Sequence, residues 1–327
     1  MSLIEAENLN KTFRIYNQGE GLRGYLKSFI SREYEEIRAV EGLNLEIDEG
    51  EMIGYIGANG AGKSTTVKML TGILEPSSGR IEVNGLDPHR HRKKNAMNIG
   101  VVFGQKTQLW WDLPVKESFK LLKEIYEVSD EDYDQRIEEF DEVLQLSDFW
   151  DQPVRKLSLG QKMRCELAAA FLHHPKIVYL DEPTIGLDVA VKERIRDFIR
   201  KMNEEKNITV MLTTHDIDDI EDLCDRIVVL DEGKKIYDGQ LDDLVDRFSS
   251  RRLVLETDEV IELETEGIKD IIDTEQGVEV VFDREIISAS DLMQEVLNNY
   301  EISDFHVKEP DIEAVVKKIY NEGLAEE

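Results

Sequence analysis

Hydrophobic and polar positions along the chain first alternate with the period of β-strands and then change to repeating strands and helices. Residues 3–13 and 43–47 alternate apolar and polar side chains. From residue 51 onward a short apolar strand, a glycine-rich turn and a helix follow one another, and later apolar strands each follow a helical stretch. This pattern predicts an α/β fold with a largely parallel sheet, whose ligand would lie at the carboxyl ends of the strands. The later strands are expected at 177–180, 209–213 and 227–230.

A different pattern begins near residue 240, where helices and strands become shorter. At 327 residues the chain is long enough for one large domain and a smaller one. We therefore expect one domain over residues 1–240 and a small α+β domain over residues 241–327. In the second domain, strands are expected at 252–256, 260–263 and 278–282, and a helix at 290–299.

Composition places the chain among soluble proteins. The hydrophobic fraction is 41% and the charged fraction 34%, and the longest apolar runs fall far short of the roughly 18 to 20 residues that span a bilayer. The N-terminus has no basic stretch followed by an apolar one, so we expect no signal peptide and a cytoplasmic location. The net charge of -30 would repel nucleic-acid phosphates, which argues against DNA or RNA as the main ligand.

A glycine-rich turn over residues 57–65 has the order G-x-x-x-x-G-K-S between an apolar strand and a helix. Its glycines let successive backbone N–H groups point at one anion, and the helix adds the positive end of its dipole. Lys63 would reach the β- and γ-phosphates of ATP, and the Ser64 hydroxyl would ligate Mg²⁺. The nucleotide-binding residues expected here are Gly57, Asn59, Gly60, Gly62, Lys63, Ser64 and Thr65.

Two adjacent carboxylates, Asp181 and Glu182, end the apolar strand at 177–180. Side chains at a strand end alternate in direction, so one carboxylate can face a metal while the next faces the γ-phosphate. Asp181 suits Mg²⁺, and Glu182 suits orienting or deprotonating the attacking water. Together with the lysine loop upstream, this pair indicates ATP hydrolysis.

The ordered set of motifs over about residues 3–240 resembles the nucleotide-binding domain of ABC transporters. In particular, the stretch Leu-Ser-Leu-Gly-Gln at 157–161 resembles the signature of that family, although Leu159 stands where the family usually has glycine. The resemblance implies that Ser158 and Gly160 contact the γ-phosphate of ATP bound to the opposite subunit, so that two chains enclose two nucleotides. Gln161 belongs to the same nucleotide-binding set.

The same resemblance implies roles for residues near other strand ends. Gln105 would be the glutamine that senses Mg²⁺ and the γ-phosphate, and Gln108 is the alternative because the preceding stretch is one residue longer than usual. His215 would be the histidine that contacts the γ-phosphate, and Asp188 would lie in the loop that crosses the dimer interface. The expected metal set is therefore Ser64, Gln105 and Asp181.

Two aromatic features carry separate expectations. Phe13 matches the position that stacks on adenine in the family, with core packing as the alternative, and Tyr16 is a second candidate for stacking. Trp110 and Trp111 are large rigid anchors of the kind found at interface centres. They would receive a permease helix if exposed, and the alternative is burial inside their own domain.

The resemblance implies an ATP-hydrolysing subunit that binds ATP and Mg²⁺ and dimerises with itself or with a related ATPase. It would drive a separate membrane permease from the cytoplasmic face. The stretch 308–313 resembles part of the accessory domain of antibiotic and sodium efflux ATPases, which favours export. An amphipathic helix is expected over 22–30, packed either on its own domain or against a permease or the membrane surface. The alternative function is that of a soluble ABC ATPase acting on ribosomes or DNA.

Overall fold

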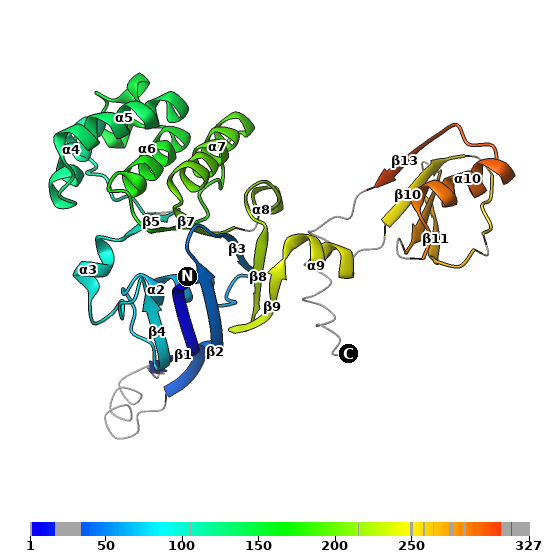
Figure 1. Ribbon diagram of the computed structural model, residues 1–327, viewed down its shortest axis with the longest axis horizontal. Coiled ribbons are helices and arrows are strands. Elements are labelled where there is room, and N and C mark those ends of the chain that lie inside the picture. Colours follow the sequence, from blue (N-terminus) through cyan, green and yellow to red (C-terminus); the bar gives the residue numbers. More distant parts are fainter. Residues whose placement is uncertain are drawn as a thin grey trace, which may run out of the picture. The chain divides into compact units, whose positions relative to one another are not determined.

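The chain forms two compact units, Met1–Gly239 and Gln240–Glu327 (Figure 1). The amphipathic segment expected at 22–30, and most of the stretch 308–313, lie outside the part of the chain that the structure describes. None of the described helices has both the length and the apolar character needed to cross a membrane. The computed structural model describes residues 2–16, 34–104, 106–214, 216–248, 251–257, 259–263, 265–274, 277–283, 286–308 and 315.

A six-stranded sheet forms the centre of the first unit. Four of its strand pairs are parallel, so the carboxyl ends of β6, β7 and β3 meet at one edge. These strands are buried along almost their whole length, as expected for a parallel sheet covered on both faces. The predicted α/β class is confirmed. In spatial order the strands are β5 (Ile99–Phe103), β6 (Ile177–Asp181), β7 (Thr209–Thr213), β3 (Met52–Gly57), β8 (Arg226–Asp231) and β9 (Lys234–Gln240).

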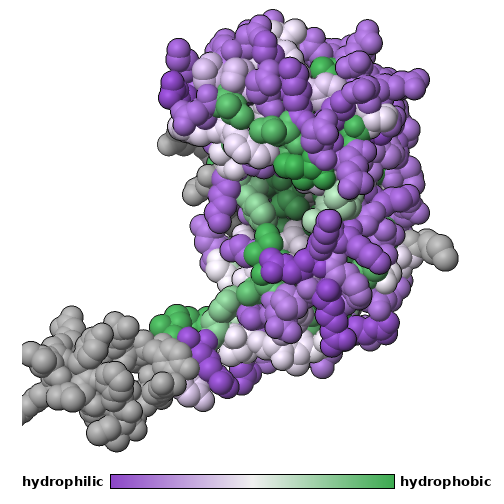
Figure 2. Space-filling view, turned by 90° about the vertical axis from the view of Figure 1, so that its left-hand side faces the viewer, coloured by the Kyte–Doolittle hydropathy of each residue, from purple (hydrophilic) through white to green (hydrophobic). Residues whose placement is uncertain are grey.

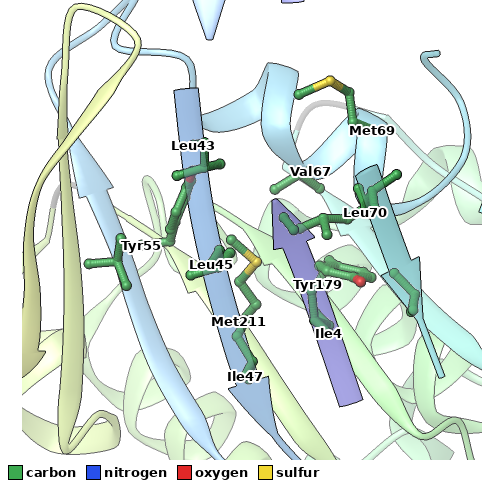
Figure 3. Close-up of a cluster of buried hydrophobic side chains, with 14 of the residues drawn as sticks. Ile4, Leu43, Leu45, Ile47, Tyr55, Val67, Met69, Leu70, Tyr179 and Met211 are labelled. Carbon is green, nitrogen blue, oxygen red and sulfur yellow. The ribbon is translucent and has the colours of Figure 1, made fainter. Parts of the chain in front are cut away.

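An antiparallel three-stranded sheet covers one side of the first unit. It consists of β2 (Tyr34–Asp48), β1 (Ser2–Tyr16) and β4 (Ser78–Val83) in that order. Helix α2 (Lys63–Leu70) shares one buried apolar cluster with both sheets. Figure 3 shows side chains of α2 facing those of the strands, so burial of this cluster holds the helix that begins at the lysine loop. The labelled members are Ile4, Leu43, Leu45, Ile47, Tyr55, Val67, Met69, Leu70, Tyr179 and Met211.

Helices α4 to α7 gather on the other side of the parallel sheet (Figure 1). The ring of Phe198 forms T-shaped pairs with the rings of Phe140 and Phe171, each with centroids 5.2 Å apart, and so joins three of these helices. Besides α2, the described helices of the first unit are α3 (Arg92–Ala96), α4 (Val115–Ile125), α5 (Asp130–Leu144), α6 (Leu159–Phe171), α7 (Val189–Lys206) and α8 (Ile217–Leu223), with short 3₁₀ turns at Ser147–Phe149 and Val154–Lys156.

The second unit has an α+β architecture. Four strands in its described part pair in antiparallel fashion in the order β11, β12, β10, β13. Leu292, Met293 and Val296 of α10 are buried against apolar side chains of this sheet. The elements are α9 (Leu241–Phe248), β10 (Arg251–Glu256), β11 (Ile268–Thr274), β12 (Gly277–Phe282), α10 (Ala289–Asn299) and β13 (Asp304–Lys308).

The prediction of a strand at 260–263 is wrong. Ile261 is only 4% exposed and packs in the core of this unit, yet no strand runs through 260–263. The sheet uses β11 and β13 instead, neither of which the pattern predicted. An extended segment that buries alternate side chains has the same apolar pattern as a strand, and only the backbone pairing distinguishes the two.

Candidate active site

The turn between β3 and α2 has the backbone of an anion cradle. Gly60 and Gly62 have φ angles of 92° and 103°, which disfavour residues with a Cβ. A Cβ on Gly62 would lie 2.4 Å from the carbonyl oxygen of Ala39, whereas a Cβ on Gly60 would meet nothing within 4 Å. The space beside Gly60 is therefore open to a ligand, and Gly62 lets the turn pass close to β2.

This turn borders a cavity of about 460 Å³. Strand ends and α2 surround it, as expected for a ligand site at the carboxyl edge of a parallel sheet. The cavity brings together the predicted lysine loop and both predicted carboxylates. Its lining residues are Ala58, Asn59, Gly60, Gly62, Lys63, Ser64, Thr65, Lys68, Ile73, Phe103, Gly104, Lys106, Asp181, Glu182 and Ile185.

Lys63 folds back onto its own turn. Its ammonium donates to the carbonyl oxygens of Gly57, at 2.5 Å, and Ala58, at 3.3 Å. Burial lowers the pKa of Lys63 from its ordinary value, and the nearby carboxylates of Glu182 and Asp181 oppose that effect. A bound triphosphate would offer the ammonium stronger, charged acceptors than these carbonyls.

Asp181 is held from two sides at the end of β6. The Oγ1 of Thr213 donates to one carboxylate oxygen at 2.6 Å, and the Oγ of Ser64 lies 3.5 Å from the other. A hydroxyl and a carboxylate are the oxygen ligands that Mg²⁺ prefers, and few of them suffice because phosphates and water complete its coordination. The residues present therefore fit a magnesium-bound nucleotide.

Glu182 leaves the extended conformation of the strand. Its φ angle is 56°, in the left-handed region that a residue with a Cβ rarely adopts, and its N–H donates to the carbonyl of Thr213 at 2.8 Å. Both Glu182 and Asp181 line the same cavity. Such local strain often accompanies a functional position.

Two predicted residues, Gln105 and His215, lie outside the described residues. Gln108, the alternative to Gln105, points elsewhere: its Nε2 donates to the carbonyl of Glu166 at 3.0 Å, and it does not line the cavity. Sequence reasoning missed Lys68, Lys106 and Thr213. Lys68 lies one helical turn after Ser64 and could have been found from that spacing, whereas nothing local marks the other two.

The predicted signature residues form the start of α6. Ser158 and Gln161 make a reciprocal capping box, in which Ser158 Oγ accepts from the Gln161 N–H at 3.2 Å and Gln161 Oε1 accepts from the Ser158 N–H at 2.9 Å. Leu159 is the first residue of the helix and has no positive φ, so leucine is tolerated there. Ser158 is exposed, and neither it nor Gly160 lines the cavity of its own chain.

Known proteins share this combination of fold and motifs. Residues 40–185 match the family model described as ABC transporter. The ABC transporter ATP-binding protein NatA of Bacillus subtilis (strain 168) is 32% identical over 227 residues, which cover 68% of this chain and 92% of NatA. The chain belongs to the ABC transporter family.

Two further comparisons refine this assignment. The methionine import ATP-binding protein MetN of Geobacillus kaustophilus (strain HTA426) is 36% identical over 209 residues, 63% of this chain and 61% of that protein. A dimeric structure of a post-hydrolysis state of the ATP-binding cassette MJ0796, bound to ADP and Pi, has a TM-score of 0.61 and 30% identity, and covers 73% of this chain and 98% of that chain. The chain is therefore an ABC ATPase.

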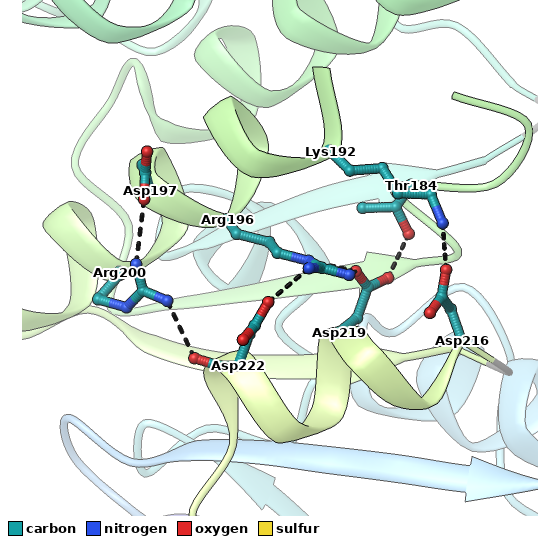
Figure 4. Close-up of polar contacts among 8 residues, drawn as sticks. All are labelled: Thr184, Lys192, Arg196, Asp197, Arg200, Asp216, Asp219 and Asp222. Carbon is teal, nitrogen blue, oxygen red and sulfur yellow. Dashed lines mark hydrogen bonds and ion pairs between the residues drawn. The ribbon is translucent and has the colours of Figure 1, made fainter. Parts of the chain in front are cut away.

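In this ABC ATPase a charge network joins the loop after Glu182 to α7 and α8 (Figure 4). Asp219 of α8 is fully buried, and its carboxylate accepts from the hydroxyl of Thr184 and, at 2.7 Å, from the guanidinium of Arg196. Asp188, predicted for the dimer-interface loop, caps α7 by accepting from the Val191 N–H at 3.0 Å. The network therefore fixes this loop against both helices. Further pairs are Lys192 with Asp216, Arg196 with Asp222, and Arg200 with the carbonyl of Asp222.

Phe13 does not belong to the core. It lies opposite Ile37 in the β1–β2 pair, 38% of it is exposed, and the Lys11 ammonium lies 5.3 Å from its ring centroid. The core-packing alternative is therefore wrong. Phe13 is not among the residues that line the cavity, and its stacking on adenine stays a prediction. The side chain of Tyr16 lies outside the described residues.

We expect Thr213→Val to weaken MgATP binding about tenfold, because Asp181 loses a donor to its charged carboxylate while the size of the buried side chain is kept. Titration calorimetry with ATP, in Mg²⁺ and in EDTA, measures the change, which should shrink in EDTA. The matched control is Thr209→Val at the opposite end of β7, where the hydroxyl accepts from the Gly50 N–H at 2.7 Å. Equal losses of MgATP affinity in both variants would contradict the role of Thr213.

We expect Asp219→Asn to lower the free energy of unfolding of the first unit by about 3 kcal/mol. The charged guanidinium of Arg196, with only 11% of its side chain exposed, would lose the buried carboxylate that it pairs with. Urea unfolding followed by tryptophan fluorescence measures this, since all three tryptophans lie in that unit. Asp197→Asn is the control: its ion pair with Arg200 is exposed and should matter by less than about 1 kcal/mol. If the two variants unfold alike, the network does not hold the loop.

Proposed function

We propose that this chain is the ATP-binding and ATP-hydrolysing subunit of an ABC transporter, that it works as a dimer, and that it powers a separate membrane permease. One observation carries the proposal. The cavity contains the lysine loop and both carboxylates, whereas exposed Ser158 lies outside it at the tip of α6. A two-fold dimer lets each copy supply Ser158 and Gly160 to the cavity of the other, with a second copy of this chain or a related ATPase as partner.

The chemistry follows from the residues that line the cavity. Backbone N–H groups of the turn would hold the phosphates, and Lys63 would exchange the carbonyl of Gly57 for phosphate oxygens. Ser64 and Asp181 would hold Mg²⁺, which neutralises charge on the phosphates. Glu182, beside Asp181, would orient the attacking water and accept its proton. Closure on ATP and reopening after hydrolysis would supply the motion that drives transport.

The permease would dock beside the tryptophans. Trp110 and Trp111 are 38% and 55% exposed, so the alternative that they are buried in their own domain is wrong. Leu121 and Ile125 of α4 are also exposed. Figure 2 shows apolar side chains gathered around a hollow on the face at the left of Figure 1, below the helical layer. Exposed aromatic and apolar side chains of this kind suit a helix of a partner, which would keep the chain at the cytoplasmic face of the membrane.

The division of labour between the two units is also a proposal. We assign nucleotide binding to residues 1–240 and an accessory role to residues 241–327, whose described part carries its own sheet and core. Support for export comes from the resemblance of the C-terminal segment to the accessory domain of efflux ATPases. Because MetN is named for import, the nucleotide-binding unit alone does not decide the direction.

Glu182→Gln is expected to trap a dimer in MgATP, because glutamine keeps the shape of the side chain but cannot accept a proton. Gel filtration should show a dimer with ATP and a monomer without it, and hydrolysis should fall at least about 100-fold. Adding Ser158→Ala to this variant should weaken the trapped dimer. A Glu182→Gln protein that stays monomeric in ATP and hydrolyses it at the normal rate would refute these roles.

Trp111→Ala is expected to weaken binding of the chain to inside-out vesicles that contain its co-expressed permease, by at least about tenfold, because an exposed aromatic anchor is lost. Sedimentation of the vesicles measures this, and Val260→Ala, in the second unit and 75% exposed before substitution, is the control. Unchanged binding of Trp111→Ala would place the permease elsewhere.

The same vesicles reveal the direction of transport. With ATP outside, accumulation of substrate in the vesicles marks export, and release of substrate marks import.

A further inference from the structure

Glu166 is a buried carboxylate for which the nucleotide chemistry has no use. It lies on α6, two turns after the Ser158 cap, and is only 3% exposed. It does not line the nucleotide cavity. Burial raises the pKa of Glu166, and hydrogen bonds from Thr107 and Gln108 oppose that effect. A buried carboxylate is kept at a cost in free energy, so its contacts indicate what it does.

Among the described residues, the donors that bond to the Glu166 carboxylate belong to one loop, residues 107–114, which we call the tryptophan loop. The Thr107 hydroxyl donates to one oxygen of Glu166, and the Gln108 N–H donates to the other at 3.1 Å. The Leu109 N–H donates in turn to the Thr107 hydroxyl at 3.1 Å. Because both carboxylate oxygens accept from consecutive residues, the start of the loop has one favoured position on α6.

The far end of the tryptophan loop is joined to the segment that leads into α6. The N–H groups of Val154 and Arg155 donate to the carbonyls of Leu113 and Trp111, each at 3.0 Å. The Arg155 guanidinium also bonds to Asp112 at 2.7 Å. Lys162 of α6 lies 5.7 Å from the ring centroid of Trp111. The loop is thus attached on one side to α6 and on the other to the residues just before Ser158.

We propose that Glu166 is a positioning residue that locks the tryptophan loop to α6, so that the loop and the Ser158 tip move as one body. This inference rests on the proposed function, in which ATP bound to one copy contacts Ser158, at the N-terminus of α6, in the other copy and displaces that helix end. With the lock intact, that displacement reaches Trp110 and Trp111 on the exposed face. Without it, two copies still close on ATP, but the tryptophans follow much less, because only the attachments at the far end of the loop remain.

The three tryptophans of the chain make the lock measurable without a permease. Trp110 and Trp111 lie in the loop, and Trp150 packs against Phe119 of α4, the helix that follows the loop, with ring centroids 5.0 Å apart. In the Glu182→Gln background we expect MgATP to change the tryptophan fluorescence as the dimer forms. Adding Glu166→Gln should reduce the amplitude of that change roughly fivefold, because an amide accepts at only one of the two positions. Dimer formation on gel filtration should be unchanged.

Variants of Thr107 separate the lock from a general effect on folding. Thr107→Val removes the hydroxyl and should reduce the fluorescence change as Glu166→Gln does, and combining the two should add little. Thr107→Ser keeps the hydroxyl, so this variant should show the full fluorescence change on addition of MgATP. The matched control is Glu117→Gln on α4, whose carboxylate meets Lys120 at the surface at 3.0 Å.

Three other outcomes of these measurements would contradict either the role of Glu166 or the proposed function. A full fluorescence change in Glu166→Gln would overturn the lock while leaving the proposed function intact. Loss of the ATP dimer in both Glu166→Gln and Thr107→Val would also overturn it, since the side chains would then serve closure itself. A Glu182→Gln parent that forms no dimer in MgATP would refute the proposed function, and the lock with it.

Discussion

Parallel pairing of β6 with β7, and of β7 with β3, is the constraint on which the candidate active site depends. The register sets Asp181 beside Thr213, and the turn after β3 then brings Ser64 within 3.5 Å of the same carboxylate. A slip of one residue would turn Asp181 to the opposite face of the sheet. The apolar strands therefore do more than fill a core, because their alignment brings together Ser64 and Asp181, which lie more than a hundred positions apart in the chain.

Buried polar groups connect the helices beside the parallel sheet to loops near the candidate site. Asp219 holds Thr184, in the loop after Glu182, against α7 and α8. Glu166 holds the tryptophan loop on α6. In a low-dielectric interior such groups strongly favour one arrangement, because an unmade hydrogen bond to a buried charge is costly. Both carboxylates lie between a loop near the site and a helix, where a fixed geometry is most useful for passing on a displacement.

The parts of the site that the sequence predicted are those whose chemistry is local. The glycine turn works through its own backbone, and Ser158 and Gln161 cap a helix across three residues. Thr213 and Glu166 were not predicted, since each acts on a residue distant in sequence and neither carries a local signal. In the second unit the apolar pattern predicted a strand at 260–263, but Ile261 is buried there without strand pairing, because burial and strand pairing are separate requirements.

The sequence by itself determined the class of the fold, the glycine-rich turn, the pair of carboxylates and the family, because each rests on short local patterns and on the order in which they follow one another along the chain. Tertiary structure decided which strand ends meet, that Phe13 and the two loop tryptophans are exposed, and that Gln108 turns toward α6 and away from the cavity. These outcomes depend on the order in which strands pair and on which helix covers which face. Such contacts join residues far apart along the chain, and no local pattern encodes them.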